Sequence, residues 1–355
     1  MPFLLALLLL ILPLRAEALA PLELRDVTDA YTRWIAENPP DPAGHPEPGY
    51  HFLAEVHAAL APWVARRPGV VRPFMAGRTV KGRPIWGYVI HDPGCPVQAR
   101  VLVFANMHAI EWVGTEDTLA LALEQAAQPM PGVELVVIPV LNVDGRLRVE
   151  ADLAAGENTF RRTNAHGVDL NRDFGVHHEA ESFWRRILPG FHRASPEPLS
   201  QPESQAVDHL AGLGHFDLAV SLHAYGGFVY LPWSGRWERP PGWPALHELG
   251  VAMSGGQGPH AYRVLQLSRW GFFFRAQGSE IDHLYGKYGI PATLVECTRT
   301  GLSPFRPGEW GNHFRVYNPA DPSRHVREGL RLLRAGMIHA ARGVPARPLA
   351  VDGPS

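Results

Sequence analysis

Continuous apolar runs separated by helical segments are the main pattern along this chain. Runs of this kind are typical of strands covered on both faces, and their alternation with helices indicates a mostly parallel sheet. We therefore predict one α/β domain with a mixed, mostly parallel central sheet and helices on both faces. The expected strands are residues 83–92, 100–108, 133–145, 216–226 and 290–298, and the clearest expected helices are residues 51–65 and 115–127.

The two ends of the chain differ from this pattern. Residues 3–14 are apolar but too few to span a bilayer, and Ala18-Leu19-Ala20 has the small-x-small form of a cleavage site. We expect a signal peptide over residues 1–20 and a secreted or periplasmic protein; a retained anchor is the alternative, because the segment before the apolar run lacks Lys and Arg. We further expect a Pro-rich extension (21–48), a folded domain (49–344) and a flexible tail (345–355).

The composition argues against nucleic acids and membranes as binding partners. The net charge is −2 and no cluster of Lys and Arg with interleaved aromatic residues occurs, so nucleic-acid binding is not expected. No second apolar run could cross a membrane, and we expect a monomer without stable membrane association after cleavage. Cys95 and Cys297 are the two cysteines. They form no disulfide framework, and we expect two unpaired, largely buried thiols.

Polar side chains follow four of the expected strands. His108 follows residues 101–105, Asn142 and Asp144 follow 136–140, His223 follows 217–221, and Glu296 follows 291–295. In open α/β sheets, ligands bind outside the carboxyl ends of the strands. The positions therefore predict a functional site built from His, Glu and Asx residues at one edge of the sheet.

The spacing His-x-x-Glu occurs three times, and only the context separates the matches. His108 and Glu111 directly follow a strand. The pair that begins at His178 lies in a polar segment, and the pair that begins at His325 opens a basic helix expected at the surface. For these two pairs, a solvated helix face is the favoured interpretation.

Two imidazoles and a carboxylate form a three-ligand zinc site that leaves a position open, as catalytic zinc requires. His108, Glu111 and His223 supply that set, which predicts one zinc ion per chain. Zinc lowers the pKa of water, and Glu296 would then serve as the general base. The competing interpretation is that each histidine is a hydrogen-bonded core residue.

A second cluster, FRRTNAHGVDLNRDF, covers residues 160–174 and crowds arginines among Asn and Asp. Its plain interpretation is a surface loop held by Arg–Asp pairs. Its functional interpretation is an anion clamp, because a guanidinium group binds a carboxylate with two parallel hydrogen bonds.

Taken together, His108-x-x-Glu111, FRRTN, GVDLNRDF, SLHAYG and VECTRTG resemble the zinc carboxypeptidases of the carboxypeptidase A type, the M14 metallopeptidases. The matching segments run in order from about residue 50 to about residue 305. The resemblance implies that His108, Glu111 and His223 bind zinc and that Glu296 is the general base. It also makes residues 49–344 a catalytic domain.

The same resemblance implies the substrate contacts. Arg161, the first arginine of FRRTN, is expected to polarise the scissile carbonyl. Asn171 and Arg172 are expected to clamp the terminal carboxylate of a peptide. The chain departs from the family at Phe274, where these enzymes usually carry a tyrosine whose hydroxyl caps the bound C-terminus. Losing that hydrogen bond puts recognition of a free C-terminus in doubt.

Ile281 is expected at the base of the side-chain pocket, which predicts a preference for apolar C-terminal residues. The neighbours implied by alignment are Phe273, Ala276, Ser279 and Leu294, with Glu280, Arg269 and Arg299 close in sequence. The leading hypothesis is an exported zinc carboxypeptidase acting on peptides. A zinc amidase or peptidase for cell-wall peptides or another unusual acyl substrate is the alternative, and a non-catalytic binding protein is the third.

Overall fold

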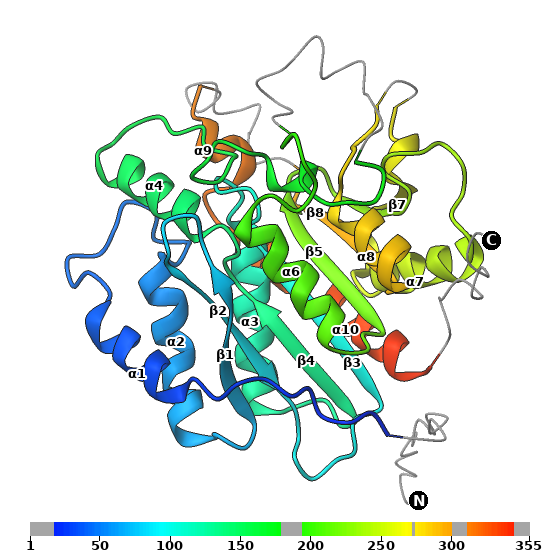
Figure 1. Cartoon of the computed structure of the whole chain (residues 1–355). Coiled ribbons are helices and arrows are strands. Elements are labelled where there is room, and N and C mark those ends of the chain that lie inside the picture. Colours follow the sequence, from blue (N-terminus) through cyan, green and yellow to red (C-terminus); the bar gives the residue numbers. More distant parts are fainter. Residues whose placement is uncertain (1–17, 179–193, 272–273, 300–310, 344–355) are drawn as a thin grey trace, which may run out of the picture.

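A mixed sheet of eight strands forms the centre of the protein (Figure 1). The computed structural model describes residues 18–178, 194–271, 274–299 and 311–343. The strand order is β1-β2-β4-β3-β5-β8-β6-β7. The strands are β1 (Val71–Arg78), β2 (Pro84–Ile90), β3 (Ala99–Ala105), β4 (Val133–Ile138), β5 (Leu218–Ala224), β6 (Phe228–Leu231), β7 (Arg263–Gln266) and β8 (Ala292–Cys297).

The four central strands run parallel. β3 pairs with β4 on one side and with β5 on the other, and β5 pairs with β8. Antiparallel pairs join β1 to β2, β2 to β4 and β6 to β8. Parallel strands need long crossovers, so helices fall between them. The predicted α/β class and mostly parallel centre are confirmed.

Side chains of β3 alternate between two hydrophobic clusters, which accounts for its unbroken apolar run. Val101 and Val103 belong to one cluster, and Leu102 and Phe104 belong to the other. Helices on the first face are α1 (Thr28–Glu37), α2 (Leu53–Arg66), α3 (Val113–Ala127), α7 (Trp243–Gly255) and α10 (Ser323–Ala341). On the second face lie α6 (Pro202–Leu213) and α8 (Glu280–Tyr288), while α4 (Val143–Ala154) and α9 (His313–Tyr317) complete the helices of the described chain.

The expected Pro-rich extension contains a helix, α1, that its sequence did not predict. α1 inserts Tyr31, 1% exposed, into the first cluster. The Tyr31 hydroxyl lies 3.0 Å from the carbonyl of His57 and 2.9 Å from the Tyr88 hydroxyl. Further upstream, the buried Leu22 donates its backbone N–H to the Glu134 carboxylate. Residues 22–37 are therefore packed against the domain rather than detached from it.

The helix that begins near His325 is also more buried than expected. Its buried residues include Leu332, Leu333 and Met337, and it contacts α3 and α7. The arginines of α10 are exposed while an apolar stripe along its other side packs inward, so α10 is a surface helix with one buried face, on which Glu328 lies. Glu328 pairs with Arg324 at 2.8 Å, so this His-x-x-Glu pair lies on a structural helix.

Several expectations concern residues outside the described ranges. These are the apolar part of the signal segment (1–17), Glu181 of the second His-x-x-Glu pair, Phe273 and the tail (344–355). Both cysteines are free, with Cys297 buried and Cys95 half-buried. Among the helices that the structure describes, none has the length and apolar character needed to cross a membrane.

Candidate active site

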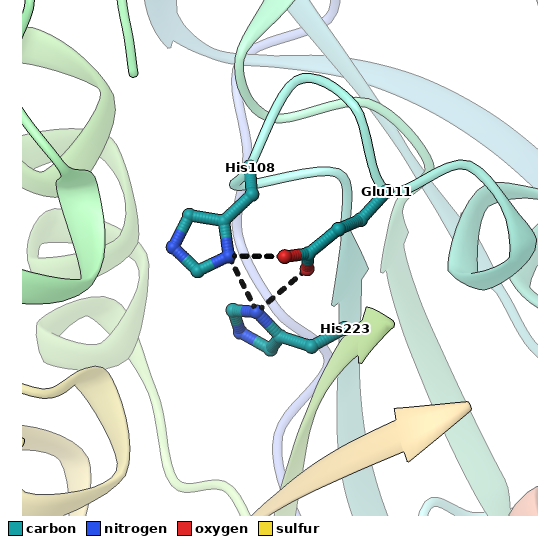
Figure 2. Close-up of side chains that lie close together, drawn as sticks. All are labelled: His108, Glu111 and His223. Atoms are coloured by element: carbon teal, nitrogen blue, oxygen red, sulfur yellow. Dashed lines mark hydrogen bonds and ion pairs between the residues drawn. The ribbon is translucent and has the colours of Figure 1, made fainter. Parts of the chain in front are cut away.

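A tight loop after β3 presents the first two predicted ligands. Asn106 adopts a positive φ of 56°, which turns the chain out of the strand. Its side-chain amide donates to the carbonyls of His108, Ala109 and Glu111, at 3.0, 3.3 and 2.9 Å. This buried amide holds the loop closed, and His108 and Glu111 project from it toward β5 (Figure 2).

His223, near the end of β5, completes the cluster shown in Figure 2. Its Nδ1 lies 3.0 Å from His108 Nδ1 and 3.1 Å from Glu111 Oε2, and His108 Nδ1 lies 2.9 Å from Glu111 Oε1. All three residues are at most 2% exposed. One atom from each side chain lies within 4.8 Å of the others.

This geometry fits a zinc ion better than a set of ordinary hydrogen bonds. Two imidazole Nδ1 atoms face each other, and such a contact needs a proton or a cation between them. Two imidazoles and one carboxylate are also the donors that catalytic zinc takes. The predicted ligands His108, Glu111 and His223 are thus brought together by the fold.

Without metal, the surrounding carboxylates favour a protonated imidazole at His223. Burial opposes a charge on His223, but hydrogen bonds from its ring to the Glu111 and Glu280 carboxylates outweigh this effect and raise the pKa of His223 to about 10. Burial likewise opposes the charge on Glu111, yet His108 and His223 outweigh it and lower the pKa of that carboxyl. The site therefore favours a positive charge between its donors.

Asp169 and Arg162 support the cluster from the other side. His108 Nε2 lies 2.9 Å from Asp169 Oδ1, which directs its Nδ1 toward the cluster. Arg162 donates through Nε to Asp169 Oδ2 at 2.9 Å and through Nη1 to Glu111 Oε1 at 3.2 Å. Despite burial, the charges of Arg162 and His108 hold the pKa of Asp169 well below its usual range.

Arg161, expected to polarise the carbonyl, lies elsewhere. Its Nε and Nη2 donate to the two carboxylate oxygens of Asp152 at 2.5 and 2.8 Å, and its side chain is 44% exposed. The neighbouring Arg162 instead contacts Asp169 and Glu111, and its side chain is 23% exposed. Arg162 is therefore the arginine that contacts the cluster of His108, Glu111 and His223, whereas Arg161 forms a bidentate ion pair with Asp152 instead.

Glu296 reaches the cluster from β8. It is the register partner of His223 on the adjacent parallel strand β5. Its Oε2 is buried and makes no hydrogen bond within the described part of the chain. Burial and the negative charge of Glu111 raise the pKa of Glu296 to about 8, although His223 and Arg162 act in the opposite direction.

The fourth strand end does not contribute to the cluster. Asn142 caps α4 by accepting from the Gly145 N–H at 3.0 Å, and its amide donates to the carbonyls of Met107 and Thr163. Asp144 pairs with Arg83 at 2.5 Å instead. The expected turn after β4 is thus the start of a helix, and its Asx residues fix the loops around the site.

Asn171 and Arg172 form a short 3₁₀ turn (Leu170–Arg172) directly after Asp169. Asp169 Oδ1 accepts from the Asn171 N–H at 3.0 Å, so the residue that orients His108 also fixes this turn. Asn171 and Arg172 are 4% and 6% exposed. The Oδ1 atom of Asn171 is buried without a hydrogen-bond partner among the described residues.

The expected pocket residues lie in and beside α8. Ile281 is fully buried in the first turn of α8 and belongs to the second hydrophobic cluster. Phe274 is half-buried, with its ring edge-on to Trp270 at 5.4 Å between centroids. Glu280 is also fully buried, and its Oε1 lies 3.1 Å from His223 Nε2.

Sequence reasoning missed three residues that touch the cluster: Arg162, Asp169 and Glu280. Asp169 lies within the GVDLNRDF motif, and its position two residues before Asn171 could have marked it. Arg162 and Arg161 have the same chemistry in sequence, and only their contacts separate them. For Glu280 no local signal exists, because its partner His223 is 57 residues away.

Comparison with known proteins agrees with this geometry. The family model of the M14 peptidases, described as zinc carboxypeptidase, matches residues 56–309. Carboxypeptidase A6 of Mus musculus is 26% identical over 274 residues, which cover 71% of this chain and 61% of that protein. The catalytic chain of human carboxypeptidase N is 28% identical over 183 residues, 46% of this chain and 39% of its own.

The chain therefore spans about three fifths or less of these relatives' length. Among solved structures, carboxypeptidase A from Helicoverpa armigera superposes with a TM-score of 0.69 at 19% identity, covering 88% of this chain and 79% of that one. This likeness concerns the fold. The family match covers most of the chain and confirms the resemblance carried by the motifs. The chain belongs to the zinc carboxypeptidase family of M14 peptidases.

Proposed function

We propose that this protein is a zinc metallocarboxypeptidase that removes the C-terminal residue of peptides. One observation carries the proposal. Of the four carboxylates around the cluster, Glu111, Asp169 and Glu280 have hydrogen-bond partners on both oxygens, whereas Glu296 Oε2 has none among the described residues. Glu111 would thus serve as a metal ligand held by its hydrogen bonds, while Glu296, with one oxygen unpaired among the described residues, would serve as a separate general base.

The proposed roles of the chain's residues follow from this arrangement. A zinc ion held by His108, Glu111 and His223 would supply a Lewis acid that acidifies water and polarises a carbonyl. Glu296 would take a proton from the attacking water and deliver it to the leaving amine. Its raised pKa, about 8 without metal, lies close to the neutral range in which one group can both accept and donate a proton.

Arg162 is the proposed stabiliser of the negative charge that develops on the carbonyl oxygen. Its Nε and Nη1 are bound to Asp169 and Glu111, which fixes the guanidinium plane at the cluster. A donor fixed in advance needs little reorganisation when charge develops. Arg161 keeps no part in this proposal.

Asn171 and Arg172 are proposed to bind the terminal carboxylate of the substrate. A carboxylate only accepts hydrogen bonds, so the proposed donors are the side-chain amide nitrogen of Asn171 and the guanidinium group of Arg172, which lie in the same buried turn. Ile281 is proposed as the base of the side-chain pocket, where its apolar side chain would favour apolar C-terminal residues. The expectation of export, from the apolar N-terminal segment, is part of the same proposal.

Phe274 favours a second candidate, an amidase or peptidase acting on cell-wall peptides or another unusual acyl substrate with the same zinc centre. A phenyl ring cannot donate the hydrogen bond that the tyrosine of similar enzymes gives to a bound C-terminus. Recognition would then depend on Asn171 and Arg172 alone.

A matched pair of peptides, one with a free and one with an amidated C-terminus, separates the two candidates. The proposal predicts release of a single C-terminal amino acid from the free peptide, with kcat/KM at least about 100-fold higher than for the amide. Mass spectrometry of the products provides the readout, with peptides ending in Leu, Phe, Lys and Glu. Equal cleavage of both forms would contradict a carboxylate clamp and favour the amidase.

A further inference from the structure

Glu280 and His223 form a buried pair that no motif of the family resemblance assigned. The carboxylate is fully buried, and its Oε1 lies 3.1 Å from His223 Nε2. The opposite ring atom, Nδ1, faces His108 and Glu111. The imidazole is therefore held between a carboxylate on one side and the metal donors on the other.

The other ligand imidazole has the same arrangement. His108 directs Nε2 to Asp169 Oδ1 at 2.9 Å and Nδ1 to the cluster. A hydrogen bond from one ring nitrogen to a carboxylate fixes the tautomer, so that the other nitrogen offers its lone pair. Both imidazoles thus present Nδ1, and each is backed by its own carboxylate.

The Glu280 carboxylate is anchored independently of His223. It belongs to the first turn of α8, where the helix dipole stabilises a negative charge. Ser279 donates to Oε2 at 3.2 Å. Ser221 is a further hydrogen-bond partner of Glu280, and its Oγ also lies 2.9 Å from His223 Nε2, so this hydroxyl joins the carboxylate and the ring. A carboxylate fixed in this way can orient a ring rather than follow it.

From these contacts we infer that Glu280 is a positioning residue for the metal: it locks His223 in the tautomer that binds zinc through Nδ1. The inference rests on the zinc site of the proposed function.

Zinc affinity tests this role directly. In Glu280→Gln, the side chain keeps its size but loses its charge; in Glu280→Asp, the charge stays but the carboxylate no longer reaches His223. We expect Glu280→Gln to weaken zinc binding about 10- to 100-fold and Glu280→Asp to weaken it in the same direction. The measurement is competition with a chromophoric chelator at pH 7.5, together with the visible spectrum of the cobalt-substituted protein, which reports ligand geometry.

Glu203→Gln is the matched control, because Glu203 is equally buried and bonds Asn164 and the Val80 N–H, away from the ligands. It should leave zinc affinity and the cobalt spectrum unchanged. If Glu280 had a purely structural role, its replacement would lower the melting temperature of the metal-free protein without changing the zinc affinity.

Either folded Glu280 variant decides the question. A zinc dissociation constant within about twofold of the wild type would overturn the positioning role. Failure of the wild-type protein itself to bind zinc would overturn the proposed function instead. The two failures are therefore distinguishable in one series of titrations.

Discussion

His223 and Glu296 are register partners on the adjacent parallel strands β5 and β8. The fold thus places a proposed metal ligand beside a carboxyl group whose Oε2 has no hydrogen-bond partner among the described residues. Among the described residues Glu296 Oε2 makes no hydrogen bond to the ligand side chains, which bond one another, so replacing Glu296 should leave the metal donors in place.

The two consecutive arginines offer a matched test of the oxyanion role. Arg162→Gln should lower kcat/KM by about 10²- to 10³-fold, because it removes a fixed donor at the cluster. Arg161→Gln removes an exposed pair with Asp152, and such pairs contribute about 0–1 kcal/mol to stability. Steady-state kinetics of both variants are the measurement. A larger loss in Arg161→Gln than in Arg162→Gln would restore the original assignment.

The stability of the metal-free protein should depend on Glu296. Burial raises its pKa to about 8 in the fold from an ordinary value of 4.5, so folding favours the protonated form. Its contribution to stability is complete below pH 4.5 and is lost as pH rises toward 8, by at most about 1.4 kcal/mol per pH unit. The measurement is thermal unfolding of the wild type and Glu296→Gln, both freed of metal with a chelator, at pH 5 to 8. Parallel curves for the two proteins would contradict it.

Zinc uptake should release protons. His223 has a pKa of about 10 without metal and therefore carries a proton at neutral pH, whereas a ligand imidazole must be neutral. We expect release of about one proton or more per zinc at pH 7.5, and an apparent affinity that increases with pH. Calorimetric titration in buffers of different ionisation enthalpy gives the number of protons released per zinc ion. A heat of binding independent of the buffer would refute the expectation.

Restoring a hydroxyl at position 274 tests the role of the phenylalanine. Phe274→Tyr should lower KM for a peptide with a free C-terminus by about tenfold, equivalent to roughly 1.4 kcal/mol, and leave kcat little changed. The amidated peptide should gain less. Phe52→Tyr, in the N-cap position of α2, serves as a control that should alter neither value. An equal gain for both peptides would show that the hydroxyl does not contact the carboxylate.

Much of the fold was predictable because continuous apolar runs are typical of buried strands in a parallel sheet. The strand expected at residues 290–298 is β8 at Ala292–Cys297, and the helix expected at 115–127 is α3 at Val113–Ala127. The short strands β6 and β7 were missed, since four residues carry too little periodicity. β1 was missed as well, because Pro73 and Gly77 interrupt its apolar pattern. α1 contains no Pro or Gly but was missed because residues 39–49, which follow it, are rich in both. The packing of Tyr31 also depends on contacts with residues far along the chain.

For the candidate site, position relative to strands was enough to select His108, Glu111, His223 and Glu296. It was not enough to separate Arg161 from Arg162, because side-chain direction in an irregular segment depends on distant partners such as Asp152. The same limit applied to Asn142, which follows a strand like the others but caps α4.

The most direct test compares bound zinc and turnover in the wild type and Glu296→Gln, purified in parallel. The account predicts about one zinc per chain in both proteins, with hydrolysis of a peptide bearing a free C-terminus by the wild type and a loss of at least about 10³-fold in the variant. Wild-type protein without zinc, or a variant that keeps its zinc and cleaves within tenfold of the wild-type rate, would contradict the account.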